Sequence, residues 1–259
     1  MGLTLEHKRR NPGRLALAAG LLVSLTVTGC GQIRDIGEEM GWVDPPQQAA
    51  PPPAVPSLEK HWVPADAAVA GTPQSKWAQR WWQWAGRFPN NNELPYRDPD
   101  GRRCAQFQEK DSAVWFLAGT DGNFEAARSC RIPANRHLFV PLINWFASEA
   151  DCARNTGEAK RFGDHVLTGL VILDGRPIGD FRRMRVASGA CFAAFNGRPA
   201  GATDGYWLML SPLPPGQHVL AITAAYHDGG KRMLQNFQYK LDVEAAPAEG
   251  AAPEVGKAQ

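Results

Sequence analysis

Apolar and polar residues alternate strictly near the end of the chain, over residues 236–244 (NFQYKLDVE). Phe237, Tyr239, Leu241 and Val243 take every second position, and polar residues lie between them. Successive side chains of a strand point to opposite faces of a sheet, so this period predicts a strand with one buried and one solvated face. Such a strand is typical of antiparallel sheets.

Further apolar or β-rich runs precede this segment. They are VWFLAG (114–119), RHLFVPLINW (136–145), HVLTGLVIL (165–173), YWLML (206–210) and HVLAITAAY (218–226). Turn-forming strings such as DPDG, FNG, PPG and HDGG occur between the runs. Many short strands with frequent turns predict a mainly β domain, an antiparallel β-sandwich of the jelly-roll type. A β-barrel is the alternative.

The run at 136–145 contains Pro141, which has no backbone N–H to give to a neighbouring strand. In an edge strand the missing donor would face solvent, and in a bulge it would leave the hydrogen-bond ladder. We therefore expect this strand to lie at a sheet edge or to carry a bulge.

Residues 76–88 follow a different period. Three tryptophans, Trp77, Trp81 and Trp84, fall on one side of a helix when about 100° is allowed for each residue. Lys, Arg and Gln residues take the opposite side, and Pro89 ends the pattern. The segment predicts one N-terminal amphipathic helix whose tryptophan face packs on the sheet.

Two further tryptophans are the candidate ligand contacts. Trp82 lies at the rim of the apolar helix face, and Trp145 lies where the run 136–145 meets a loop. Aromatic rings can stack on the C–H faces of sugars, and both side chains combine an apolar body with an N–H donor. Packing at the rim of the core is the alternative use of Trp82.

The first 29 residues have the composition of an export signal. A basic stretch (6–14) precedes an apolar run (15–27) that is too short for a free transmembrane helix. The run leads into VTGC, which resembles the lipobox of bacterial lipoproteins. The resemblance implies cleavage before Cys30, acylation of this cysteine and attachment to the lipid membrane. The residue after Cys30 is Gly31. In the lipoproteins that the chain resembles, an aspartate at this position implies retention in the inner membrane, so Gly31 implies transfer to the outer membrane, facing the periplasm. An ordinary secretory signal is the alternative.

Segments with few core-forming residues flank the predicted β domain. Residues 30–72 include DPPQQAAPPPAVP and predict a Pro/Ala-rich tether of extended chain. Residues 245–259 predict a disordered tail of low complexity. The stretch between them, 73–244, is long enough for one domain with its own core.

The apparent basicity of the chain belongs mainly to its signal. Removing residues 1–29 takes four basic and one acidic residue from totals of 28 and 26, which leaves a net charge of −1 with His neutral. No basic run survives in the remainder, so nucleic-acid binding has no electrostatic basis here.

Besides Cys30, the chain contains four cysteines: Cys104, Cys130, Cys152 and Cys191. An even number in an exported domain predicts two disulfides, for which three pairings are possible. We favour Cys104–Cys130 with Cys152–Cys191, because each pair brackets a local segment. The sequence contains no CxxC motif, which argues against a catalytic thiol.

Four strings in the domain resemble a family of secreted bacterial proteins of uncharacterised function. They are RWWQW, CAQFQ…VWFLAG, CRIPANRHLFVPLIN and DGYWLMLSPLPPGQHVLAI, which together span most of residues 77–243. The resemblance implies an exported β-rich domain. It implies no activity and supplies no catalytic positions.

The sequence lacks the common catalytic motifs, including GxSxG, Walker and HExxH. His137, His165 and His218 are far apart in the sequence, so they could form a metal site only if the fold brought them together. We predict neither a metal nor a cofactor. The prediction is therefore a non-catalytic envelope lipoprotein that binds a glycan, peptidoglycan or an envelope protein. A secreted hydrolase or metal-dependent enzyme with a site assembled from distant loops is the alternative, and a purely structural role is a third possibility.

Overall fold

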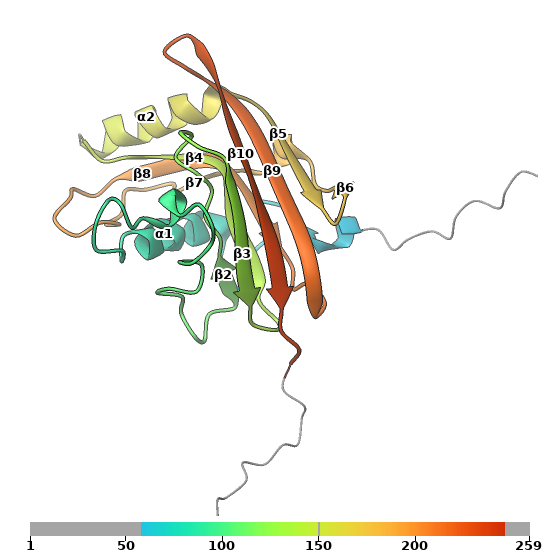
Figure 1. Cartoon of the computed structure of the whole chain (residues 1–259). Coiled ribbons are helices and arrows are strands. Elements are labelled where there is room, and N and C mark those ends of the chain that lie inside the picture. The colour runs from blue at the N-terminus through green and yellow to red at the C-terminus, as the bar shows by residue number, and fades with distance from the viewer. Residues whose placement is uncertain (1–57, 150, 247–259) are drawn as a thin grey trace, which may run out of the picture. The chain divides into compact units, whose positions relative to one another are not determined.

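In the computed structural model of the chain, the described residues are 58–149 and 151–246, and they form a mainly β fold of two mixed sheets (Figure 1). The predicted signal peptide, Cys30, residues 31–57 and the tail from 247 lie outside the described residues. The helices of the described part are α1 (Gln74–Ala85), α2 (Cys152–Asp164) and the short 3-10 helices η1 (Leu58–His61), η2 (Pro95–Arg97) and η3 (Phe181–Arg183). Neither of these α-helices combines the length and the apolarity that a membrane crossing requires.

The first sheet contains two long strands and three short ones. Its members are β1 (Trp62–Val63), β2 (Val114–Phe116), β4 (His137–Ala147), β7 (Arg185–Ala187) and β8 (Ala202–Leu210). The strand order is β1-β8-β4-β2, and β7 also pairs with β8. β4 and β8 run antiparallel, whereas β2 runs parallel to β4.

The second sheet is formed mainly by the C-terminal half of the domain. Its members are β3 (Ala126–Ile132), β5 (Val166–Leu173), β6 (Arg176–Pro177), β9 (Gly216–Asp228) and β10 (Lys231–Val243). The strand order is β3-β10-β9-β5-β6, and Figure 1 shows the long members of this sheet side by side. β9 and β10 form an antiparallel hairpin, whereas β3 runs parallel to β10.

Each sheet therefore contains one parallel pair, and the prediction of purely antiparallel pairing is wrong in that respect. The turn strings in the sequence indicate hairpins, which join antiparallel neighbours. They carry no information about strands that pair across a long stretch of chain, as β3 and β10 do. Both sheets keep open edges among the described residues, so the alternative of a closed barrel is wrong as well.

One hydrophobic core lies between the two sheets. Phe237, Tyr239, Leu241 and Val243 of β10 are buried and alternate with exposed residues, which confirms the strand and its predicted face. They belong to the same cluster of buried side chains as Leu138 of β4. The two sheets therefore face each other across shared apolar side chains.

A second hydrophobic cluster covers the opposite face of the first sheet. Trp77, Trp81 and Trp84 of α1 are 3%, 1% and 1% exposed, so the burial predicted for them is confirmed. They cluster with Phe139 of β4 and Trp207 of β8, and the Trp81 and Trp207 ring centroids are 5.5 Å apart. β4 and β8 are thus buried on both faces, which accounts for their nearly continuous apolar sequences.

β4 occupies a central position, with β8 on one side and β2 on the other, so the option of an edge strand at Pro141 is wrong. The option of a bulge is confirmed, because the register with β8 shifts between Pro141 and Ile143. The extra residue lets the strand accommodate a proline that cannot donate a hydrogen bond.

α2 is a second helix that the sequence pattern did not predict. The carboxylate of Asp151 caps it by accepting a 3.0 Å hydrogen bond from the backbone N–H of Arg154. The buried residues of the helix are Asn155, Ala159 and Gly163, which are spaced four apart on one face. Because these residues are small or polar, the helix shows no apolar stripe that a search for periodicity would detect.

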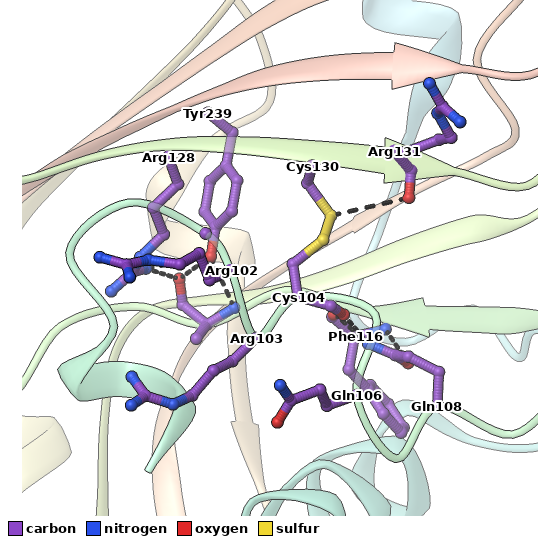
Figure 2. The surroundings of a disulfide bond; sticks show 12 residues. Arg102, Arg103, Cys104, Gln106, Gln108, Phe116, Arg128, Cys130, Arg131 and Tyr239 are labelled. Carbon is purple, nitrogen blue, oxygen red and sulfur yellow. Dashed lines mark hydrogen bonds between the residues drawn. A yellow bond between two sulfur atoms is a disulfide. The ribbon is translucent and has the colours of Figure 1, made fainter. Parts of the chain in front are cut away.

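Both disulfides have the predicted pairing. Figure 2 shows the bond between Cys104, in the segment before β2, and Cys130 of β3, whose Cα atoms are 5.9 Å apart. The second bond joins Cys152, the first residue of α2, to Cys191, and the Cα atoms of this pair are 5.8 Å apart. The preference for local pairs is therefore confirmed.

The folded unit begins before residue 73, where the sequence placed its start. Trp62 and Val63 form β1 and pair with Leu210 and Met209 of β8. The Trp62 side chain packs partly buried against the core between the sheets. The tether predicted for residues 30–72 therefore extends too far, because its last residues contribute a strand.

Candidate functional site

A cleft with a volume of about 540 Å³ lies between α1, α2 and one end of β4, β9 and β10. β2 pairs only with the first three residues of β4, from His137 to Phe139, so this edge of β4 has no strand partner beyond them. Residues 144–146 of β4 line the cleft. A cavity of this volume is in the range that binds small organic ligands.

Eight aromatic side chains line the cleft. They are Trp81, Trp82, Tyr96, Trp145, Phe146, Phe162, Phe195 and Tyr226. On the α1 side, the centroid of the Trp82 ring lies 5.2 Å from that of Phe146 and 6.1 Å from that of Phe195. On the α2 side, Trp145 stacks on Phe162 at 5.4 Å with an angle of 24° between the rings. The cleft therefore offers aromatic faces on two sides.

The structure brings together the two tryptophans that the sequence singled out as ligand contacts. Trp82 is 8% exposed, and its indole N–H donates to the Thr203 hydroxyl at 2.8 Å. The same hydroxyl donates to the backbone carbonyl of Trp145 at 2.6 Å, so one threonine links both residues. Trp82 is thus a fixed part of the wall that also packs in the core.

Trp145 is the exposed ring of the cleft. It is 44% exposed, although most large apolar side chains of the described part are buried. Its position is fixed by the stack on Phe162 and by a 3.2 Å hydrogen bond from its indole N–H to Oε1 of Glu158. Both partners belong to α2, so this helix holds the ring in place.

Polar side chains lie among the aromatic ones. They are Thr120, Asp121, Asn144, Glu158, Arg161, His165, Arg198, His227 and Gln235. The Gln235 amide donates to the carbonyl of Thr120 at 2.8 Å, and burial raises the pKa of the Tyr96 hydroxyl on the same wall. A mixture of aromatic faces and polar groups suits a ligand that is itself amphipathic.

Two carboxylates line the cleft, and each has a partner within the described residues. Oδ2 of Asp121 lies 3.2 Å from Nε of Arg97, and Oε1 of Glu158 accepts the hydrogen bond from Trp145. Asp164 lies outside the cleft lining. Its pKa is held below the ordinary value by hydrogen bonds from Lys160 and Arg185.

The histidines do not assemble a metal site in the part of the chain that the structure describes. No group of three or more His, Cys, Asp or Glu side chains there is arranged to hold a metal ion. His218 lies 2.8 Å from Oδ2 of Asp174 and 2.9 Å from the carbonyl of Pro214, which gives both ring nitrogens a structural use. His165 lines the cleft together with His227.

A buried arginine supports the cleft wall formed by residues 119–121. Arg128 of β3 is 2% exposed, and its Nη1 donates to the carbonyls of Ala118 at 2.6 Å and Gly119 at 2.9 Å. The Tyr239 hydroxyl accepts a third hydrogen bond from Nη1, and Figure 2 shows the two side chains together. The Arg128 guanidinium thus fixes the chain that leads from β2 into the cleft.

Several cleft residues have no signal in the sequence. Arg161 and Glu158 belong to the helix that the pattern missed, and Arg198 lies in a turn-rich stretch. Asn144 is adjacent to Trp145, which is the one local hint that it belongs to a site. Their convergence depends on pairings between distant segments.

No protein-family model matches the chain, and no curated protein matches it significantly. Comparisons with known proteins therefore assign neither a family nor a function. The resemblances to lipoproteins and to a secreted bacterial family therefore stay predictions. The chemistry of the cleft is what supports a function.

Proposed function

We propose that the protein is an envelope lipoprotein, attached to the outer membrane through acylated Cys30, whose β domain binds a glycan in the cleft without modifying it. The observation that carries the proposal is the exposed Trp145 ring, held by Phe162 and Glu158 beside polar side chains. Exposing an indole ring to water costs free energy, and a ligand that stacks on the ring removes this cost.

The composition of the wall supports a saccharide rather than a purely apolar ligand. Sugars present an apolar C–H face, which suits a ring such as Trp145, and a rim of hydroxyl groups. Side chains such as Asn144, Glu158 and Gln235 can exchange hydrogen bonds with that rim. Peptidoglycan belongs to this class through its glycan strands, whereas an envelope protein is the competing partner.

The disulfides support an exported location. Two cystine bridges in one domain are typical of proteins that fold in an oxidising compartment such as the bacterial periplasm. The lipobox adds the anchor, and the Pro/Ala-rich segment adds a spacer. We also infer that the two facing sheets form a sandwich, for which the shared core is the support; the jelly-roll order stays a prediction.

The experiment is a glycan-array screen of the full-length protein in detergent, followed by titration of the binders. We expect binding of at least one glycan class, and a loss of affinity of about tenfold or more in Trp145→Ala, equivalent to about 1.4 kcal/mol. Leu170→Ala is the matched control, because Leu170 is 48% exposed on β5 and does not line the cleft. Equal affinity in wild type and Trp145→Ala, or capture of no glycan, would contradict the proposal.

A hydrolase is the second candidate function, because Asp121 and Glu158 line the same cleft and glycosidases use two carboxylates. Both groups also have structural uses, in the ion pair with Arg97 and in holding Trp145. Incubation of each bound glycan with the protein distinguishes the two functions. Cleavage that is lost in both Asp121→Asn and Glu158→Gln would establish the hydrolase, whereas intact glycan supports binding alone.

A further inference from the structure

The side-chain amide of Asn144 has an unused donor at the cleft. Nδ2 is buried and has no hydrogen-bond partner among the described residues, although the residue lines the cavity. Gly205 is its neighbour across the ladder with β8, and a Cβ there would come within 2.7 Å of the Asn144 Cβ. A buried N–H without an acceptor costs free energy, and a ligand oxygen would remove that cost.

Two cations of the cleft also lack a carboxylate partner within the described residues. Arg161 of α2 and Arg198 both line the cavity, and neither forms an ion pair with a carboxylate in the described residues. The Arg198 guanidinium lies over the Phe195 ring at 5.4 Å from its centroid, which orients it beside the aromatic wall. Guanidinium groups bind carboxylates through paired, charge-assisted hydrogen bonds.

The charge balance of the cleft favours an anion. Asp121 is neutralised by Arg97, which leaves Glu158 as the carboxylate of the lining without a cationic partner in the described part. Against it stand Arg161 and Arg198, so the remaining formal charge is positive. Glu158 is also engaged by the Trp145 indole N–H.

We infer that the cleft selects a saccharide that bears a carboxylate group, with the sugar ring on Trp145 and the acid group recognised by Arg161, Arg198 and the amide of Asn144. This inference rests on the proposed function, since it names the class of glycan that the same site binds. The three polar groups supply two positive charges and one unpaired buried donor. A neutral sugar has no negative charge for the two arginines to bind, whereas a carboxylate does.

The test compares short oligouronides of galacturonate, glucuronate and mannuronate with their methyl esters, which have the same rings without the charge. Affinities are measured for the full-length protein in detergent by calorimetry. At least one oligouronide is expected to bind about tenfold or more tightly than its ester. Arg161→Gln and Arg198→Gln are expected to remove that preference. Arg154→Gln is the matched control on α2, because Arg154 pairs with Asp151 and does not line the cleft.

The outcomes separate this inference from the proposed function. If neutral glycans or the methyl esters bind as tightly as the acids, the selectivity for a carboxylate is wrong and glycan binding stands. If no saccharide of either kind binds, both are wrong. If the acids bind tightly but both arginine variants keep the preference, the acid group is recognised elsewhere and the inference is overturned.

Asn144→Ala provides an independent readout, because a ligand-binding role and a structural role predict opposite effects. The unpartnered Nδ2 costs the free protein stability, so the variant is expected to keep or raise its melting temperature while its affinity for the oligouronide falls about tenfold. A lowered melting temperature with unchanged affinity would show that Asn144 serves the fold and would remove it from the site.

Discussion

At the residue scale, Arg128 shows how this fold accommodates a buried charge. The Arg128 side chain reaches the Asp98 carbonyl through Nε at 2.6 Å and the carbonyls of Ala118 and Gly119 through Nη1. Its guanidinium also lies 5.4 Å from the centroid of the Tyr239 ring. Asp98 directly follows η2 and Gly119 lies after β2, so one side chain ties these two separate segments to β3.

We predict that Arg128→Met is strongly destabilising, although methionine is apolar and of similar length. The variant leaves the buried carbonyls of Asp98 and Gly119 without their donor, while the Ala118 carbonyl keeps its hydrogen bond from the Tyr239 hydroxyl. The free energy of unfolding should fall by about 3–5 kcal/mol. Urea denaturation measures the change. Arg131→Met on the same strand is the control, because its side chain is 73% exposed and its loss should cost less than about 0.5 kcal/mol. Equal denaturation midpoints for the two variants would contradict this role.

At the element scale, α2 depends on contacts at both ends for its place beside the cleft. Its first residue, Cys152, is bonded to Cys191. Near its last residue, Arg185 of β7 bridges Asp164 of the helix at 2.7 Å and Asp204 of β8 at 2.8 Å. The helix itself buries little apolar surface, so these links replace the packing that usually holds a helix.

Removing the disulfide Cys152–Cys191 should therefore loosen α2 specifically. The double variant Cys152→Ser, Cys191→Ser should lose about 3–4 kcal/mol of stability and show faster amide exchange in α2 than wild type. The matched control is Cys104→Ser, Cys130→Ser, which should lose similar stability while α2 keeps its protection. Hydrogen exchange read by mass spectrometry checks both. Protection of α2 that is unaffected by the first variant would contradict the prediction.

Elements with an apolar face could be predicted from the sequence pattern, whereas elements whose buried face contains polar or small residues could not. The alternation in β10 and the tryptophan face of α1 were sufficient to predict both. β3 has the same alternation of buried and exposed residues, but Arg128 is one of its buried side chains, so the pattern appears polar. α2 buries Asn155 and Gly163 and gives no stripe either.

The candidate site was predictable only in its tryptophans. Trp82 and Trp145 stood out because neither was fully explained by a periodic face. Asn144 and Arg161 did not stand out, because polar residues are common in loops and on helices, and their significance comes from long-range pairing. The alternation of side chains in a strand indicates a face, but it does not show which distant segment covers it.

At the scale of the whole molecule, stability should fall in mildly acidic solution. Burial lowers the pKa of His61, with smaller effects from Lys60 and His218, and burial also lowers the pKa of His137. The unfolded chain then binds protons near pH 6.5 that the folded chain does not bind, so unfolding becomes easier as pH falls through that value. The stability that these histidines contribute is fully present above about pH 7, and it is lost as the pH falls toward their lowered folded-state pKa values.

The measurement is urea denaturation at about pH 7.5 and about pH 5.5, for wild type and for the double variant His61→Gln, His137→Gln. Wild type should lose more stability between the two values than the variant, because the variant lacks the groups that take up protons. Parallel losses in the two proteins would show that these histidines do not cause the pH dependence.

The predicted anchor also belongs to the whole molecule. Mature protein from bacterial membranes should begin at Cys30 and carry the added mass of acyl chains, and Cys30→Ala should move the protein to the soluble fraction. Intact-mass analysis and fractionation check the two statements. A free thiol at Cys30 in membrane-associated protein would contradict the anchor while leaving the cleft in place.

The most direct test of glycan binding in the cleft is a crystal structure of the protein with its tightest-binding saccharide. We predict a sugar ring stacked on Trp145, an acid group between Arg161 and Arg198, and a ligand oxygen about 3 Å from Nδ2 of Asn144. A saccharide bound on another surface, with the cleft empty and Nδ2 of Asn144 still without a partner, would contradict it.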